Sequence, residues 1–148
     1  MNIERMKQLL EHLKQLPEER FDYSFWGHFP DNPNSRITGD QLANHCGTCG
    51  CVAGWTCALF SPEIRLVDFD TADEARVLLG LNSDEARFLF YRLKTFGFRS
   101  DTFDKYSSSG RGLLGTGLQI AIRKIEFLIE RAENEQIDGK TDRSESRN

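Results

Sequence analysis

The sequence lacks any long hydrophobic run. None of its 148 residues falls in a stretch approaching the roughly 18 apolar residues that a membrane helix needs. The first residues, Met1–Gln8, are already interrupted by charges, and no apolar segment of the kind found in secretion signals follows them. We therefore expect a cytoplasmic protein without a membrane partner.

The chain also lacks an excess of basic residues. Its 19 Lys and Arg are outnumbered by 23 Asp and Glu, which gives a formal net charge of -4. Proteins that bind nucleic-acid phosphates normally present a basic face, so nucleic acid is an unlikely partner. The 39% hydrophobic and 11% aromatic content is nevertheless sufficient for a buried core.

Apolar residues recur at helical spacing along most of the chain. The predicted helices cover residues 3–16, 52–60, 71–79, 83–93 and 116–132, with a short turn near 40–43. The stretch 52–60 is apolar nearly all round, which is typical of a buried central helix. We therefore predict an all-α, irregular bundle of about five helices, with at most one short strand or hairpin; Ile64–Phe69 is the strand candidate.

Helix starts and domain limits follow from composition. We expect residues 1–132 to form one helical domain and residues 133–148, where Ile137 is the one large apolar residue, to form a polar, flexible tail. Ser, Thr and Asp before an apolar stripe are typical N-caps. The predicted caps are Thr38 or Asp40, Thr48, Thr71, Ser83 and Thr116.

Four cysteines lie between positions 46 and 57, and we interpret them first as packing residues. Cysteine is among the most buried residue types, and glycines allow another backbone to come close. On this interpretation the segment is a tight turn into the central helix, anchored by Trp55. The structural motif comprises Cys46, Gly47, Thr48, Cys51, Gly54 and Trp55.

A structural zinc site is the second interpretation of the cysteines. Cys46 and Cys49 have the spacing of half a zinc site, with His45 and Cys51 beside them. No second CxxC or HxxxH pair exists, and His28 is the remaining distant ligand. We predict no metal or other cofactor, and structural zinc stays open as the alternative.

A catalytic thiol is the third interpretation. Cys46-Gly47-Thr48-Cys49 echoes a stretch of papain-like proteases, but that mechanism needs a histidine downstream of the cysteine. All three histidines (His12, His28 and His45) precede Cys46. A cysteine-dependent hydrolase is therefore kept only as an alternative.

The motif Cys46-Gly47-Thr48-x-x-Cys51-Val52-Ala53-Gly54-Trp55 resembles a family of small, uncharacterised bacteriophage and bacterial proteins. The resemblance covers roughly residues 8–130 and includes Leu16-Pro17-x-x-x-Phe21-Asp22, Leu78–Leu81 and Glu85–Phe90. It implies a phage or mobile-element setting and no particular reaction. Cys49 and Cys57 depart from the family pattern, which weakens the pairing of Cys46 with Cys49 in a zinc site.

Two further stretches are candidates for binding a ligand or partner. Aromatic side chains are frequent in binding hot spots, and the first stretch contains four of them: Phe21, Tyr23, Phe25 and Trp26. The second stretch, Gly110-Arg111-Gly112-Leu113-Leu114-Gly115, matches G-x-G-x-x-G. No strand precedes it, so a dinucleotide fold is excluded, but glycine amides before a helix can still hold an anion.

These observations predict a non-enzymatic, phage-type accessory protein. We expect it to bind a host protein or a small anionic, nucleotide-like ligand, with counter-defence as a role. A zinc-stabilised interaction module and a cysteine-dependent hydrolase are the alternatives. The sequence leaves a homo-oligomer open.

Overall fold

The regular structure of the protein is helical, as predicted. The computed structural model describes residues 1–92, 103 and 114–145. Its elements are α1 (Ile3–Gln15), the 3₁₀ turn η1 (Glu18–Arg20), α2 (Gly39–Asn44), α3 (Val52–Phe60), α4 (Asp68–Leu79), α5 (Ser83–Phe90) and α7 (Gly117–Glu145). Within the described ranges, β-structure is limited to isolated bridges, so the chain is all-α.

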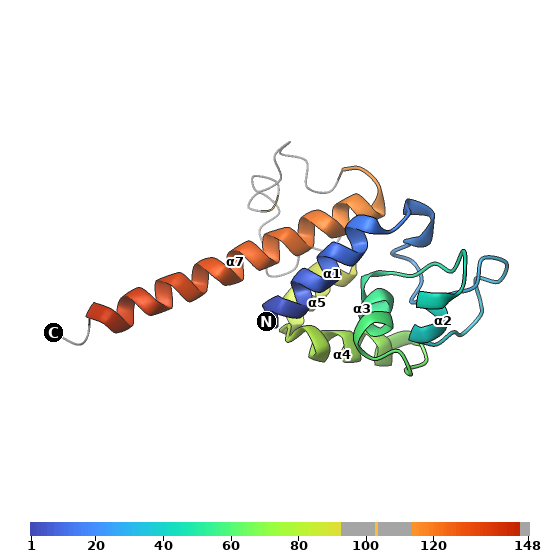
Figure 1. The fold of residues 1–148 in the computed structure, drawn as a ribbon, viewed down its shortest axis with the longest axis horizontal. Coiled ribbons are helices and arrows are strands. Elements are labelled where there is room, and N and C mark those ends of the chain that lie inside the picture. The colour runs from blue at the N-terminus through green and yellow to red at the C-terminus, as the bar shows by residue number, and fades with distance from the viewer. Residues whose placement is uncertain (93–102, 104–113, 146–148) are drawn as a thin grey trace.

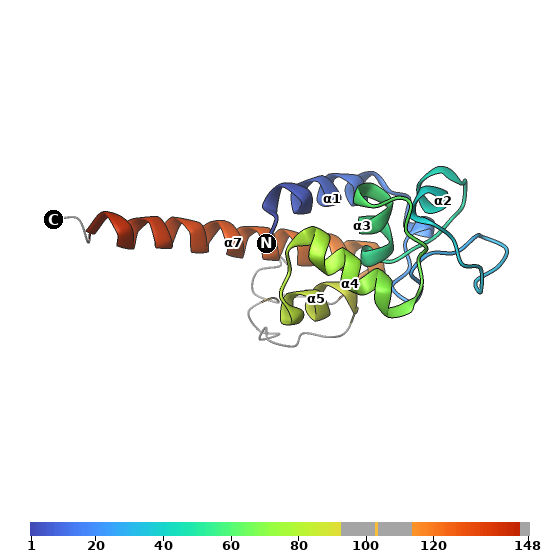
Figure 2. The same cartoon turned by 90° about the horizontal axis from the view of Figure 1, so that it is seen from below.

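Helix α3 lies at the centre of the fold, which confirms the predicted buried helix. All side chains from Val52 to Ala58 are buried, because the helix is apolar on every face. Helices α2 and α4 pack on α3, and α1 lies along the first half of α7 (Figures 1 and 2).

Helix α1 has the apolar stripe that its sequence predicts. Met6, Leu9 and Leu13 are fully buried, and Lys7, Gln8 and Glu11 between them are exposed. The His12 ring, by contrast, packs on Trp55 with centroids 5.0 Å apart. At the edge of the contact with α7, Lys7 pairs with Glu133 at 2.6 Å. The outer face of α1 is thereby tied to α7 without any charge entering the core.

Two helices start at other residues than predicted. Helix α4 begins at Asp68, so Thr71 lies inside it and its hydroxyl donates to the Val67 carbonyl at 3.0 Å. The N-cap of α5 is Asn82 rather than Ser83. The N-cap of α4 is Val67, four positions before Thr71, and that of α5 is one position before Ser83; sequence spacing defines a helix start only to within a few residues.

The other predicted caps can also be compared with the structure. Thr38 caps α2 through a reciprocal pair of hydrogen bonds with Gln41. Thr116 does the same with Gln119 at the start of α7. In the strand candidate, Arg65 forms a single antiparallel bridge with Thr38 before α4 begins.

Helix α7 continues through Glu145, where the sequence predicted a polar, flexible tail for residues 133–148. Figures 1 and 2 show its C-terminal half projecting away from the other helices. Residues 134–140 are exposed, including Ile137 with 63% of its surface accessible. The segment includes the helix formers Glu, Gln, Lys and Arg and lacks proline, so nothing in its backbone ends the helix at the edge of the packed region. Among the described helices, none is long and apolar enough to cross a membrane.

Candidate functional site

The cysteine segment forms a tight turn that is joined to the aromatic stretch by backbone pairing. Gly47 adopts a left-handed φ of 79° at the turn. Cys49 then exchanges two backbone hydrogen bonds with His28, at 2.9 and 3.1 Å, and the Cys51 N–H donates to the Phe25 carbonyl at 2.8 Å. The turn therefore holds the chain around Phe25 directly against the start of α3.

Gly54 allows this aromatic stretch to lie on α3. A Cβ at Gly54 would lie 1.7 Å from the Trp26 carbonyl oxygen, and one at Gly50 would lie 2.9 Å from the same atom. The backbone at Trp26 thus occupies the space that any larger residue at position 54 would need. The predicted role of the glycines, close approach of a second backbone, is seen directly at these two positions.

Thr48 does not cap α3, although the sequence predicted that it would. The N-cap of α3 is Cys51, and no side chain caps the helix there. The buried Thr48 hydroxyl instead lies 2.6 Å from the Leu42 carbonyl and 2.8 Å from the His45 carbonyl, so it binds the end of α2. The turn between α2 and α3 reverses the chain, and Thr48 therefore points back toward the preceding helix.

Arg20 is a structural residue that sequence reasoning missed. Its guanidinium donates to the carbonyls of Leu42 at 2.8 Å and Thr48 at 3.1 Å, and to the Thr48 hydroxyl at 2.9 Å. It also lies over the Trp55 ring, whose Nε1–H donates to the Arg20 carbonyl at 3.1 Å. Arg20 therefore joins η1, the end of α2 and α3. The sequence gives no periodic signal for this contact.

The buried cysteines are poorly suited to nucleophilic chemistry. All four are free thiols, and only Cys46 is exposed. Burial raises the pKa of Cys49 and Cys51 to about 11 and that of Cys57 to about 12. A thiol with a raised pKa carries little reactive thiolate at neutral pH.

The structure also places the residues considered for zinc. His28 lies opposite Cys49 across the antiparallel bridge, and the His45 ring packs against Phe29 with centroids 5.2 Å apart. In the described parts of the chain, no three His, Cys, Asp or Glu side chains lie close enough together to hold a metal ion.

Iodoacetamide should modify the native protein at Cys46 alone. Cys46 is exposed, whereas the other three cysteines are at most 8% accessible and have raised pKa values. At pH 7.5 we expect one equivalent of label by mass spectrometry, none over the same time in Cys46→Ser, and full labelling in denaturant. Preferential labelling of Cys49 or Cys51 would contradict this and favour an activated thiol.

The aromatic stretch is mainly a cover for the core, and its two ends line separate pockets. Phe21 is buried, while Tyr23, Phe25 and Trp26 are half-buried. The Phe25 ring packs against His28 at 4.7 Å between centroids, and the Phe21 ring meets Tyr23 edge-on at 5.1 Å. Phe21 and Tyr23 line a pocket at the start of α7, whereas Phe25 and Trp26 line a separate pocket of about 260 Å³.

The Tyr23 pocket, as we name it, has a volume of about 490 Å³. Its walls come from the aromatic stretch, the end of α5 and the start of α7: Phe21, Asp22, Tyr23, Ser24, Tyr91, Arg92 and Gly117. Gly117 packs directly on the aromatic rings, since a Cβ there would lie 3.3 Å from Tyr23 and 3.5 Å from Phe21. The volume is within the range of small-molecule sites.

Charged side chains lie at and near the pocket: Arg92 and Asp22 line it, and the charge of Arg123 acts on Tyr23. The Tyr23 hydroxyl is buried and has no hydrogen-bond partner among the described residues. Burial raises the pKa of this phenol, and the charges of Arg92 and Arg123 partly oppose that rise. Arg92 donates to the Gly115 carbonyl at 3.2 Å, and Arg123 donates to the Leu114 carbonyl. The Asp22 carboxylate supplies a negative charge in the lining of the pocket.

The glycine-rich candidate is only partly visible. Gly110, Arg111 and Gly112 lie outside the described residues. Gly115 is described, with a left-handed φ of 105°, and it leads into α7 at the edge of the Tyr23 pocket. Of the described residues that follow this stretch, Gly117 at the start of α7 lines the Tyr23 pocket together with Phe21 and Tyr23.

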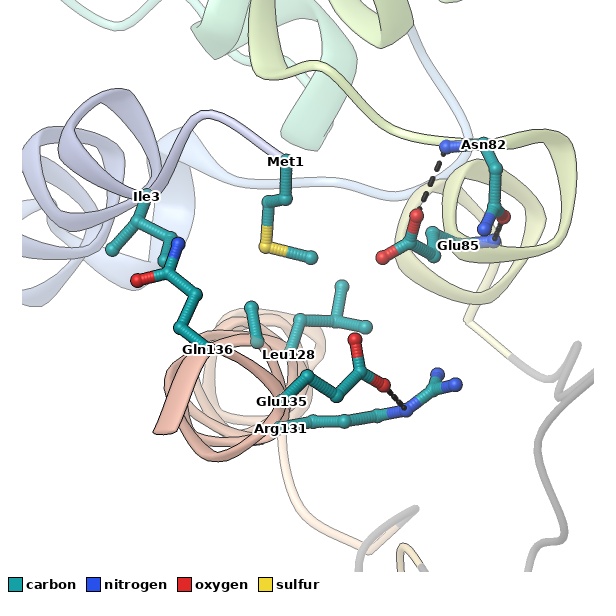
Figure 3. Close-up of a pocket in the computed structure, with 9 residues that line it drawn as sticks. Met1, Ile3, Asn82, Glu85, Leu128, Arg131, Glu135 and Gln136 are labelled. Carbon is teal, nitrogen blue, oxygen red and sulfur yellow. Dashed lines mark hydrogen bonds and ion pairs between the residues drawn. The ribbon is translucent and has the colours of Figure 1, made fainter. Parts of the chain in front are cut away.

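Another pocket, of about 300 Å³, lies between the N-terminal residues, α5 and α7 (Figure 3). Its polar groups bind one another: Glu85 pairs with the backbone of Asn82, and Glu135 pairs with Arg131 at 3.2 Å. The side chain of Met1 lies among them. The Tyr23 pocket is larger and has three aromatic residues in its lining, so it is the stronger ligand site of the two.

The chain matches none of the protein-family models, curated proteins or solved structures with which we compared it.

Proposed function

We propose that the protein is a non-enzymatic binding protein that takes a small anionic, nucleotide-like ligand in the Tyr23 pocket. The observation that carries the proposal is the meeting of Phe21 and Tyr23 with Gly117 at the start of α7. Ligand pockets typically combine apolar walls with a few polar groups that fix orientation, and this pocket has both.

The walls suit a planar ring. Phe21, Tyr23 and Tyr91 present aromatic surface, and rings of a ligand pack on such surfaces in stacked or edge-on geometries. The Asp22 carboxylate also lines the pocket and can accept from a ligand N–H or O–H. Together these groups favour a heteroaromatic ring over an aliphatic chain.

Two other residues that line the pocket, Arg92 and Gly117, suit an anionic group. Arg92 lines the pocket, and Gly117 brings the N-terminal end of the 29-residue helix α7 to it. The N-terminus of a helix carries partial positive charge and N–H groups directed along its axis. An arginine beside such a terminus favours phosphate or carboxylate.

The biological setting comes from the sequence resemblance. The motif from Cys46 to Trp55 suggests a bacteriophage or mobile-element protein. In that setting, sequestering a small nucleotide-like ligand is a way to act against host defence. The raised pKa values of Cys49, Cys51 and Cys57 support binding over thiol catalysis.

The proposal predicts a thermal shift with 3′,5′-cyclic adenosine monophosphate. At tenfold excess over the dissociation constant, binding to the native state should raise Tm by about 4 °C, whereas uncharged adenosine should give a smaller shift. Arg92→Gln and Tyr91→Ala should lose the shift, because both residues line the pocket.

Arg87→Gln is the matched control, since Arg87 is an exposed arginine on α5 and does not line this pocket. It should retain the full shift. If the ligand raises Tm equally in Arg92→Gln, Tyr91→Ala and Arg87→Gln, it binds outside the Tyr23 pocket. Absence of any shift with cyclic adenosine monophosphate would refute the nucleotide-like ligand, and capture of a host protein that depends on Tyr91 and Arg92 would then assign the pocket to a protein partner.

A further inference from the structure

Lys124 is a fully buried lysine beneath the Tyr23 pocket. It lies on α7, and its Nζ donates to the carbonyls of Phe88 and Tyr91, both at 2.7 Å, and of Arg92 at 3.1 Å. These carbonyls belong to the C-terminal end of α5 and the turn after it. Tyr91 and Arg92, which follow α5, also line the pocket.

Among the described residues, the amine of Lys124 has backbone carbonyls as its hydrogen-bond acceptors and forms no ion pair with a carboxylate. Its Nζ lies 4.9 Å from the centroid of the Phe88 ring and 5.9 Å from that of Tyr23. The carbonyl end of α5 carries partial negative charge, so it favours a cation at this position. Burial acts in the opposite direction, because removing a charge from water is costly.

Building on the proposed function, we propose that Lys124 is a positioning residue that fastens the Tyr91–Arg92 wall of the Tyr23 pocket only while it is protonated. Ligand binding is then weaker when Lys124 loses its proton. The residue acts through the wall of the pocket and does not itself line it.

The number of donors explains the proton dependence. An ammonium has three N–H donors, which match the three carbonyls, whereas a neutral amine has two. Deprotonation therefore leaves one carbonyl without its donor. Arg92 is the expected one to be released, since its contact is the longest of the three.

The change falls close to neutral pH. Burial lowers the pKa of Lys124 to about 7. The titratable or charged groups placed around it are Tyr23 from the aromatic stretch, Tyr91 and Arg92 after α5, and Arg123 on α7. Burial raises the pKa of the Tyr23 phenol, so that group stays neutral in this range.

Nuclear magnetic resonance of the ligand-free protein tests the fastening directly. Between pH 6 and 9, the carbonyl ¹³C shifts of Phe88, Tyr91 and Arg92 should titrate together with the Lys124 ¹³Cε signal, with a midpoint near 7. The carbonyl titration should vanish in Lys124→Met. It should persist in the control Lys7→Met, which removes an exposed lysine from α1.

Binding of cyclic adenosine monophosphate is the second readout, because the charge of this probe is constant over the same range. Its affinity should fall about threefold or more between pH 6 and 9 in the wild type. Lys124→Arg, which stays charged, should bind with little pH dependence. If Lys124→Met does not fold, the wild-type titration and the arginine variant still decide the question.

The outcomes separate the two proposals. Titration of the three carbonyls without any binding of the probe would support the fastening and refute the ligand class. Binding that is independent of pH, with carbonyl shifts that do not titrate, would support the ligand class and overturn the role of Lys124. A Lys124 ¹³Cε midpoint above 9 would also overturn it.

Discussion

Replacing Gly54 by alanine should lower the free energy of unfolding by about 4 kcal/mol or more, which is a large part of the stability of a small domain. The added Cβ would lie 1.7 Å from the Trp26 carbonyl oxygen, far inside van der Waals contact. Alanine at a helical site normally gains about 1 kcal/mol over glycine. Here the steric overlap reverses that sign.

Gly139→Ala is the matched control, because it makes the same change in helix α7 where no atom lies within 4 Å of the new Cβ. It should leave stability unchanged or raise it slightly. Gly50→Ala should give an intermediate loss, since its Cβ would lie 2.9 Å from the same Trp26 oxygen. Urea unfolding followed by circular dichroism measures all three.

The order of stability among Gly54→Ala, Gly50→Ala and Gly139→Ala is the decisive result. If Gly54→Ala fails to fold, Gly50→Ala still reports the contact with Trp26 in soluble protein. A Gly54→Ala protein as stable as Gly139→Ala would show that the backbone at Trp26 does not lie on α3 in solution.

Replacing Arg20 by alanine should destabilise the protein by about 3 kcal/mol. Hydrogen bonds from a charged donor are each worth about 1.5–3 kcal/mol and are not additive, and Arg20 makes several to Leu42 and Thr48. The substitution also removes the cation that lies 5.1 Å from the centre of the Trp55 ring. Chemical denaturation gives the size of the loss.

Two variants test the mechanism of this loss. Arg20→Lys should recover only part of the stability, since a lysine lacks the planar set of donors that reaches several carbonyls at once. Arg36→Ala, at an exposed position, should change stability by less than about 0.5 kcal/mol. If Arg20→Ala loses no more stability than Arg36→Ala, Arg20 does not hold η1, the end of α2 and α3 together.

The helices were predictable because their apolar residues recur at regular spacing. The stripe of Met6, Leu9 and Leu13 and the wholly apolar α3 both lie where their patterns place them. Start positions were less certain: several residues near a helix start can serve as the cap, and Asn82 takes that role in place of Ser83. The extension of α7 past residue 133 was missed because a polar helix without a buried face has no hydrophobic period.

The candidate site was predictable only in parts. The sequence singled out Phe21 and Tyr23 and, separately, the glycine-rich stretch, but no local pattern says that Gly117 packs on those two rings. Lys124 was missed for the same reason. A lysine within an amphipathic helix normally faces solvent. Lys124 points inward because the carbonyls of Phe88 and Tyr91, at the end of α5, accept hydrogen bonds from its amine.

The contact between Gly54 and Trp26 has an evolutionary consequence, because the atom of Trp26 that lies against Gly54 is its backbone carbonyl oxygen. The carbonyl of residue 26 is present whatever side chain that residue has, so substitutions at position 26 cannot relieve the restriction at position 54. We expect homologues to vary at 26 while keeping glycine at 54, and the two positions to show no covariation. A search for coevolving pairs would therefore overlook one of the tightest contacts in the fold.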